Sequence, residues 1–195
     1  MEPYIKARSG FIVEPIVKTF RALHITPDGL TIAGFLLNCV AGVLIAMGFV
    51  WQGGLVMTAL AMPLDGLDGP LARSIGVHSK WGAFLDSTLD RYAEAAILLG
   101  VAWNFLEHGQ NWHVAATFVA LLGSLMVSYA RARAESIGVK GDVGLFSRFG
   151  RFIILVLGLL FAAVTPLAPV IMVWALAILS NVTAIQRMMH VARNT

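Results

Sequence analysis

Charged residues are scarce in this chain: Asp, Glu, Lys and Arg make up 13% of its 195 residues, whereas 58% are hydrophobic. A soluble domain carries roughly 25% charged residues, so most of this chain is not in contact with water. Cysteine is nearly absent too, and the single Cys39 excludes an intramolecular disulfide. No linker or low-complexity tract divides the sequence, which predicts one domain over residues 1–195.

Hydrophobic runs fill most of the sequence. A membrane-spanning helix needs roughly 20 mostly apolar residues, and six runs come close to that length. We expect membrane helices over 31–50, 53–75, 82–104, 112–134, 149–164 and 167–191, joined by short polar or Gly/Pro connections. The predicted fold is an all-α integral membrane protein with a six-transmembrane-helix bundle over residues 26–195.

The N-terminal segment differs from these runs. It has no continuous apolar core, so we do not expect a secretory signal. Apolar residues at positions 12, 13, 16, 17 and 20 follow helical spacing, and bases lie among them. A basic amphipathic helix of this kind lies in the membrane interface. We expect residues 1–25 to form a juxtamembrane amphipathic helix that tethers the bundle, with a direct role in substrate binding as the alternative.

Lysine and arginine gather on one side of the predicted bundle. All 14 lie at or beside the N-terminal segment, the second-to-third connection, the fourth-to-fifth connection or the C-terminal end. Glu107 is the only formal charge in the three opposite connections. Because basic residues mark the cytoplasmic side, we expect a multi-pass protein of the cell membrane with both termini and the functional face in the cytoplasm.

Four aspartates lie within the predicted second and third spans. Asp65 and Asp68 are three residues apart, and Asp86 and Asp90 are four apart, so each pair lies on one helix face. The two helices are antiparallel neighbours, and Asp68 and Asp86 lie roughly 6–8 Å inside their helix ends at 1.5 Å per residue. The two pairs are therefore expected to meet just below the cytoplasmic surface.

Ionised carboxylates at this depth need compensation. Each costs roughly 2.5–3.5 kcal/mol within a span, and like charges repel further. The nearby bases Arg73, Lys80 and Arg91 are too few to neutralise them, whereas divalent cations do, and oxygen ligands suit Mg²⁺ or Mn²⁺. Two such ions would form a clamp for displacement at phosphorus. A polar seam that orders the bundle, or an ion pathway, is the alternative.

The segment from Asp65 to Asp90 follows a specific pattern. It reads Asp65-Gly66-Leu67-Asp68-Gly69-Pro70-Leu71-Ala72-Arg73, then eight residues to Gly82, then Asp86 and Asp90. This resembles the motif D-x2-D-G-x2-A-R-x8-G-x3-D-x3-D of the CDP-alcohol phosphotransferase family at every fixed position. The size, the six spans and the cytoplasmic orientation also resemble that family.

The resemblance implies a metal-dependent enzyme of phospholipid biosynthesis. It would transfer a phosphatidyl-type group from CDP-diacylglycerol or CDP-archaeol to an alcohol and release CMP. Two ions, Mg²⁺ or Mn²⁺, would be held by Asp65, Asp68, Asp86 and Asp90. Asp90 would also be the catalytic base that deprotonates the acceptor hydroxyl. The resemblance further implies a homodimer, and nucleic acid is not expected among the partners.

The same resemblance implies a site for the CDP-linked donor. Gly69, Ala72 and Arg73 would meet its pyrophosphate and cytidine region, and Gly82 would allow close approach. Upstream, the family often has Pro-Asn-x-x-Thr, where this chain has Asp28 in place of Asn. The candidate donor-binding residues are Asp28, Gly29, Leu30, Thr31, Gly69, Ala72, Arg73 and Ser79. Tight helix packing is the alternative role of the small residues.

Arginines around the fourth-to-fifth connection point to an anionic acceptor. Arginine forks pair well with phosphate, and the candidate acceptor-binding residues are Arg131, Arg148, Arg151 and Arg187. Cytoplasmic topology combined with anionic lipid headgroups is the alternative explanation for these bases.

The identity of the acceptor follows from a second resemblance. The stretch 131–144 looks like that of the phosphatidylinositol-phosphate and archaetidylinositol-phosphate synthase branch, which accepts inositol phosphate. That branch commonly has Glu-Arg-x-x-Arg where this chain has Ser147 before Arg148 and Arg151. We expect inositol phosphate as the acceptor, with glycerol 3-phosphate as the alternative. A divalent-cation transporter or a non-catalytic membrane scaffold is the competing function of a different class.

Overall fold

Every regular element in the described part of the chain is a helix. The computed structural model describes residues 13–76, 79–141, 143–144 and 146–195, and these ranges contain no strand. After a helix over 13–22, the elements are α2 (Pro27–Ala46), α3 (Val50–Val56), the π-helical turn η1 (Met57–Ala61), α4 (Met62–Ser74), α5 (Lys80–Glu107), α6 (Asn111–Ser136), α7 (Arg148–Leu160), the 3₁₀ turn η2 (Phe161–Ala163) and α8 (Leu167–Asn194). The all-α prediction is confirmed.

Each of the six predicted runs coincides with a helix or with a series of helices. The second run is composite, since α3, η1 and α4 follow one another over 50–74, and the fifth is α7 with η2. α2 begins earlier than predicted, at Pro27, because the Thr26 hydroxyl caps it by accepting from the Gly29 amide at 3.1 Å. Of the described helices, α2, α6 and α8 are long and apolar enough to cross a membrane.

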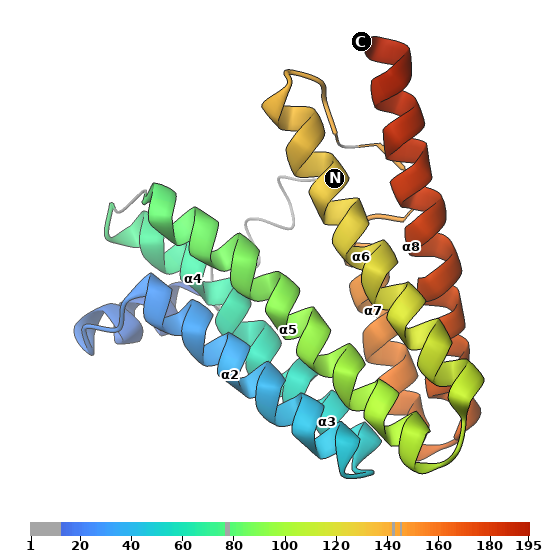
Figure 1. Ribbon diagram of the computed structural model, residues 1–195. Helices are drawn as coiled ribbons and strands as arrows, with labels where there is room; N and C mark the ends of the chain where they lie inside the picture. Colours follow the sequence, from blue (N-terminus) through green and yellow to red (C-terminus); the bar gives the residue numbers. More distant parts are fainter. Residues whose placement is uncertain (1–12, 77–78, 142, 145) are drawn as a thin grey trace.

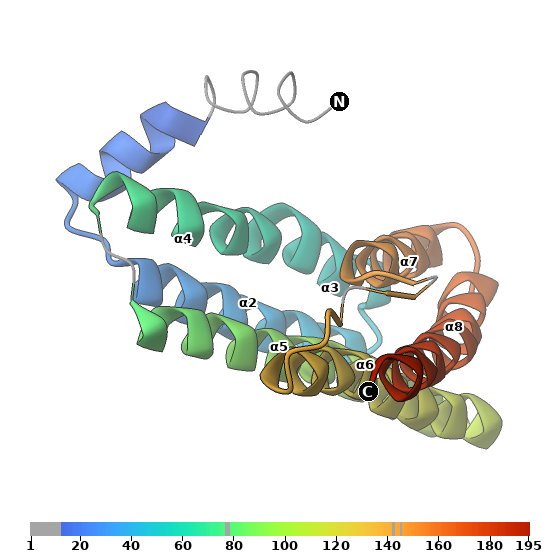
Figure 2. The same ribbon diagram turned by 90° about the horizontal axis from the view of Figure 1, so that it is seen from above.

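The helices form two groups that diverge toward one end (Figure 1). α2, α4 and α5 lie together in one group, and α6, α7 and α8 lie together in the other. Seen from above, the helix over 13–22 lies across the outer end of the first group (Figure 2). α4 ends, α5 begins and α8 ends at the divergent end, so the predicted aspartates and arginines share that end of the bundle.

The main core lies where the two groups meet. Ile45 of α2, Ile97 and Leu98 of α5, Leu159 of α7 and Met172 of α8 are almost fully buried in one cluster. A second, smaller cluster joins Val17 to Leu30 of α2 and to Leu67 and Leu71 of α4. This contact attaches the helix over 13–22 to the bundle, while residues 1–12 of the predicted juxtamembrane helix lie outside the described residues.

A π-helical turn interrupts the second predicted run. The amide of Met62 donates to the carbonyl of Met57, five residues earlier, and Pro63 follows directly. Proline has no N–H to bond to the carbonyl of Ala59, and its ring crowds that turn. A π turn adds one residue to the helix, which rotates the residues that follow by roughly 100° relative to an uninterrupted α-helix. Asp65 and Asp68 follow this turn.

Glycines bring α2 and α5 into backbone contact. A Cβ added to Gly100 would overlap the backbone of Gly42, and one added to Gly42 would overlap the backbone of Ala96. Small residues allow such close approach in membrane helices. This crossing fixes the position of α5, which carries Asp86 and Asp90.

We therefore expect Gly100→Val to destabilise the protein by about 1–3 kcal/mol, since the added methyl groups must push α2 away from α5. Thermal unfolding in detergent measures the change. Gly66→Ala is the matched control, because an added Cβ at Gly66 meets nothing within 4 Å. Equal melting temperatures for the two variants would contradict the close crossing.

Candidate active site

Three of the predicted metal ligands converge. Asp65 and Asp68 of α4 and Asp86 of α5 each offer one carboxylate oxygen, and these oxygens lie within 4.8 Å of one another. The three-residue spacing on α4 places its two aspartates on one face, and the antiparallel α5 brings Asp86 to the same level. A set of carboxylate oxygens fits a hard divalent cation such as Mg²⁺ or Mn²⁺.

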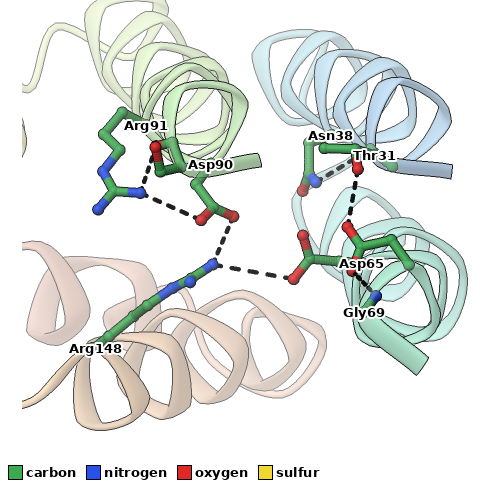
Figure 3. A network of polar contacts seen from close by, with 10 residues as sticks. Thr31, Asn38, Asp65, Gly69, Asp90, Arg91 and Arg148 are labelled. Atoms are coloured by element: carbon green, nitrogen blue, oxygen red, sulfur yellow. Dashed lines mark hydrogen bonds and ion pairs between the residues drawn. The ribbon is translucent and has the colours of Figure 1, made fainter. Parts of the chain in front are cut away.

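Asp68 is held in position by two neighbours. Thr31 of α2 donates from Oγ1 to Asp68 Oδ2 at 2.8 Å, and the amide of Gly69 donates to Asp68 Oδ1 at 2.5 Å. Figure 3 shows Thr31 reaching across from α2 toward this carboxylate. Bonds of this kind orient a metal-binding carboxylate.

Asp90 stands apart from the other three aspartates. Arg148 Nη2 donates to its Oδ1 at 2.5 Å, and Arg91 Nη1 lies 3.3 Å from its Oδ2. Arg148 also lies 4.0 Å from Asp65 Oδ2, so it bridges α5 and α4 from α7 (Figure 3). The structure therefore pairs the fourth predicted ligand with arginine, a pairing that sequence spacing did not reveal.

A cavity of about 510 Å³ lies between α2, α4 and α5, and we call it the α2–α4–α5 cavity. The metal candidates Asp68 and Asp86 line it. Six of the predicted donor-binding residues also line it: Asp28, Thr31, Gly69, Ala72, Arg73 and Ser79. The sequence resemblance thus selected residues that the fold gathers around one space.

The other two predicted donor-binding residues have local contacts. Leu30 is buried in the small cluster with Val17 and Leu71. The amide of Gly29 donates to the Thr26 hydroxyl, which caps α2. Gly82 also lines the cavity, and a Cβ there would lie 3.1 Å from Asp28 Oδ1. Gly82 therefore leaves room for the Asp28 carboxylate at the cavity wall.

A second cavity, of about 120 Å³, lies between α2, α5 and α7, and we call it the α2–α5–α7 cavity. Its polar lining includes Thr31, Asn38, Asp65, Asp90, Glu94, Arg148 and Arg151. Thr31 lines both cavities, and the three clustered aspartates divide between them. The carboxylate cluster therefore lies at the boundary between two spaces.

The four predicted acceptor-binding arginines do not all meet in this cavity. Arg148 and Arg151 line it. Arg131 Nε donates to Glu135 Oε1 at 2.9 Å on the surface of α6. Arg187 is buried and donates to the backbone carbonyls of Val127 and Val143, which ties α8 to α6 and to the following connection.

Two polar residues of the second cavity, Asn38 and Glu94, were not among the predicted site residues. Asn38 lies seven residues, about two helical turns, beyond Thr31 on α2, and its Nδ2 donates to the Gly34 carbonyl. Glu94 lies one turn beyond Asp90 on α5, and it accepts from Ser124 Oγ at 2.6 Å. The four-residue step from Asp90 to Glu94 places Glu94 on the same helix face in the sequence, where it was considered only as a continuation of an ion pathway.

The chain belongs to the CDP-alcohol phosphatidyltransferase family, because a sequence model of that family matches residues 24–181. It is 44% identical over 177 residues to the archaetidylinositol phosphate synthase of Pyrococcus horikoshii, with 90% of this chain and 88% of that protein covered. It is 35% identical over 212 aligned positions to the phosphatidylinositol phosphate synthase of Cutibacterium acnes, covering 99% and 98% of the two chains.

Solved structures agree with this assignment. The crystal structure of Mycobacterium tuberculosis phosphatidylinositol phosphate synthase with CDP-DAG bound is similar over 92% of this chain and 93% of that chain, with a TM-score of 0.87 and 33% identity. A structure of the same enzyme in complex with manganese and citrate has the same TM-score of 0.87 and the same identity of 33%, over 92% and 88% of the two chains.

The Thr31–Asp68 hydrogen bond is expected to strengthen metal binding by orienting the Asp68 carboxylate. Thr31→Val keeps the shape of the side chain but removes the donor to Asp68, so we expect Mn²⁺ to bind about 10–100-fold more weakly. Titration of the purified protein with Mn²⁺ measures this. Thr117→Val is the control, since the Thr117 hydroxyl bonds within α6 to the His113 carbonyl. Unchanged affinity in Thr31→Val would show that Asp68 needs no such support.

Proposed function

We propose that this chain transfers the phosphatidyl-type group of a CDP-linked lipid to a phosphorylated alcohol and releases CMP. The observation that carries the proposal is the cluster of Asp65, Asp68 and Asp86 at the boundary of two cavities. We assign the CDP-linked end of the donor to one cavity and the acceptor to the other, so that the cluster lies where their reacting atoms would meet. Membership of the CDP-alcohol phosphatidyltransferase family supports the same chemistry.

In this proposal the metal ligands are Asp65, Asp68, Asp86 and Asp90. Three of them already converge, and Asp90 is the proposed ligand of a second ion. Mg²⁺ or Mn²⁺ suits the all-oxygen donor set, and a related enzyme has been crystallised with manganese. When bound, the ions neutralise the pyrophosphate and stabilise the charge that develops at phosphorus.

The α2–α4–α5 cavity is the proposed donor site. Arg73 lies in it close to Gly69, where its guanidinium can pair with phosphate oxygens of the donor. Asp28, Thr31, Ala72 and Ser79 would complete the wall, with Gly29 and Leu30 fixing the α2 start that carries them. A related enzyme with CDP-DAG bound has the same fold, which supports a CDP-linked lipid as the ligand.

Asp90 is the proposed base. Its carboxylate lines the α2–α5–α7 cavity and takes the proton of the acceptor hydroxyl as the oxygen attacks the lipid-side phosphorus. The bond from that phosphorus to the CMP oxygen breaks, and CMP leaves. Arg148 is exposed over 62% of its side chain and already holds Asp90, so it can orient the base and bind the acceptor phosphate.

Inositol phosphate is the acceptor we propose, because the two sequence relatives compared above are synthases named for inositol phosphate lipids. Arg131, Arg151 and Arg187 join Arg148 in the proposed anionic site, where Arg187 also holds the connection after α6 in place. Glycerol 3-phosphate is the alternative acceptor. Ion transport is the alternative of a different class, favoured only by the buried acids.

We further propose that residues 1–195 form one membrane domain with six spans. The apolar lengths of α2, α6 and α8 support three of them, and the helical series α3–η1–α4, α5 and α7–η2 supplies the rest. The one-sided distribution of bases supports cytoplasmic termini and a cytoplasmic site. The helix over 13–22 is the proposed juxtamembrane tether, and a homodimer is the proposed assembly.

The deciding experiment is CMP release by purified protein from CDP-diacylglycerol or CDP-archaeol with Mn²⁺ or Mg²⁺. We expect release that depends on the metal and on inositol phosphate. The assay is repeated with glycerol 3-phosphate and with serine to identify the acceptor. No release with any acceptor, together with divalent-cation flux in vesicles, would indicate that the protein is a transporter and not an enzyme.

Asp90→Asn tests the role of the base. It keeps the size of the side chain but cannot take the acceptor proton, so we expect turnover to fall by about 10²–10⁴-fold. Binding of the CDP-linked lipid should stay within about threefold of the parent, because Asp90 does not line the α2–α4–α5 cavity. Calorimetry with the donor and the CMP assay measure the two effects, and normal turnover would remove Asp90 from this role.

A further inference from the structure

Two ion pairs, one helical turn apart, connect α5 to α7. The outer pair joins Asp90 to Arg148 at 2.5 Å. The inner pair joins Glu94 Oε1 to Arg151 Nε at 3.7 Å. Glu94 follows Asp90 by four residues and Arg151 follows Arg148 by three, so both helices present their charges on one face. All four side chains line the α2–α5–α7 cavity.

The inner arginine is deeply buried but incompletely bonded. Arg151 is 4% exposed, and neither its Nε nor its Nη1 has a hydrogen-bond partner among the described residues. The 3.7 Å separation from Glu94 gives charge attraction without a hydrogen bond. A buried donor without a partner carries a free-energy cost, which is larger when the donor is charged. A ligand that accepts hydrogen bonds would remove that cost.

The carboxylate of the inner pair, Glu94, is also bound by a residue of α6. Ser124 of α6 donates to Glu94 Oε1 at 2.6 Å, and Ser124 itself is buried. Glu94 is thereby fixed from α6 on one side and attracted by Arg151 of α7 on the other. A pair that served packing alone would close to hydrogen-bond distance, because only good geometry offsets the desolvation of two buried charges. The open geometry suggests a fixed acceptor and a fixed donor that share a ligand.

From this arrangement, and on the basis of the function proposed above, we propose that Glu94 and Arg151 form the floor of the acceptor site and bind hydroxyl groups of a polyol. The acceptor phosphate stays at Arg148, the exposed member of the outer pair. The polyol extends inward, past Asp90, to the inner pair. In this inference Arg151 binds hydroxyl groups of the acceptor and not its phosphate. The anionic site proposed above is thereby reduced to Arg131, Arg148 and Arg187, and Arg151 takes a role in acceptor selection.

Hydroxyl chemistry matches this floor. A hydroxyl donates one hydrogen bond and accepts others, so it can donate to the Glu94 carboxylate and accept from the Arg151 guanidinium at once. Glu94 lies one turn from Asp90, roughly 6 Å along the helix. A six-carbon polyol can place one hydroxyl at Asp90 and others at this depth. Glycerol 3-phosphate has two hydroxyls on a three-carbon chain and cannot reach both levels.

The consequence is discrimination between acceptors. A site that hydrogen-bonds a substrate hydroxyl rejects an analogue that lacks it, because the buried polar groups stay unpaired. The floor therefore favours a phosphorylated polyol with many hydroxyls over glycerol 3-phosphate. Neither Glu94 nor Arg151 lines the α2–α4–α5 cavity, so the CDP-linked donor should be unaffected by changes at the floor.

The test compares Glu94→Gln with Glu107→Gln in the CMP-release assay. Both change a glutamate of α5 in the same way, but Glu107 is exposed at the opposite end of the helix. For Glu94→Gln we expect the KM for inositol phosphate to rise at least tenfold, the kcat to fall less than threefold, and the KM for the donor to stay constant. Glu107→Gln should match the parent in all three.

A second variant guards against a failure to fold. Arg151→Lys keeps the positive charge but loses the guanidinium fork, and we expect the same rise in acceptor KM. Thermal unfolding of each variant shows whether it is folded. An acceptor KM within twofold of the parent in the folded variants would overturn the proposed role of Glu94 and Arg151. A loss of kcat in both variants without a change in acceptor KM would overturn it as well.

Assays of the unsubstituted protein test the proposed function and the proposed polyol-binding floor separately. If it releases no CMP with any acceptor, the proposed function fails. If it releases CMP with glycerol 3-phosphate and not with inositol phosphate, the transferase stands and the polyol floor is overturned. If it uses inositol phosphate and the floor variants lose acceptor affinity, both stand.

Discussion

The constraint on which this structure depends is the placement of several carboxylates inside a largely apolar helix bundle. Asp65 is exposed, Asp68 and Asp86 are partly buried, and the three lie together, so holding their like charges this close has an electrostatic cost. Only a strong positive field offsets that cost. The fold supplies part of it through Arg148 and Arg91 beside Asp90, and the oxygen cluster is suited to divalent cations for the rest.

Rigid packing keeps this arrangement from relaxing. The close crossing of α2 and α5 at Gly42 and Gly100 fixes the helix that carries Asp86 and Asp90. The core around Ile45, Ile97 and Leu159 joins the two groups of helices, and Ile97 of this core also lines the α2–α5–α7 cavity. The α2–α5–α7 cavity lies where the two groups diverge, and the α2–α4–α5 cavity lies within the first group. The carboxylates therefore stand between two open spaces above a packed core.

Much of the fold followed from the sequence because each hydrophobic run forms a helix or a continuous series of helical elements. The six runs and the bases at their ends could be read directly, since length and charge are local properties. The π turn at Met57–Ala61 could not, although Pro63 indicates an irregularity there. The α2–α4–α5 cavity was predicted in most of its lining, since the motif fixes relative positions on two adjacent helices. Gly29 and Leu30 are the exceptions, because the amide of Gly29 donates to the Thr26 cap and the side chain of Leu30 packs into the small cluster.

Sequence alone determined the helical class, the likeness to the family and the identity of the carboxylates at the site, because those depend on residue type and on spacing along one or two neighbouring helices. The tertiary structure decided which groups meet across distant helices. Arg148 and Arg151 are 58 and 57 positions from Asp90 and Glu94, and no period in the sequence relates α5 to α7. Their pairing is set by how the second group of helices packs against the first.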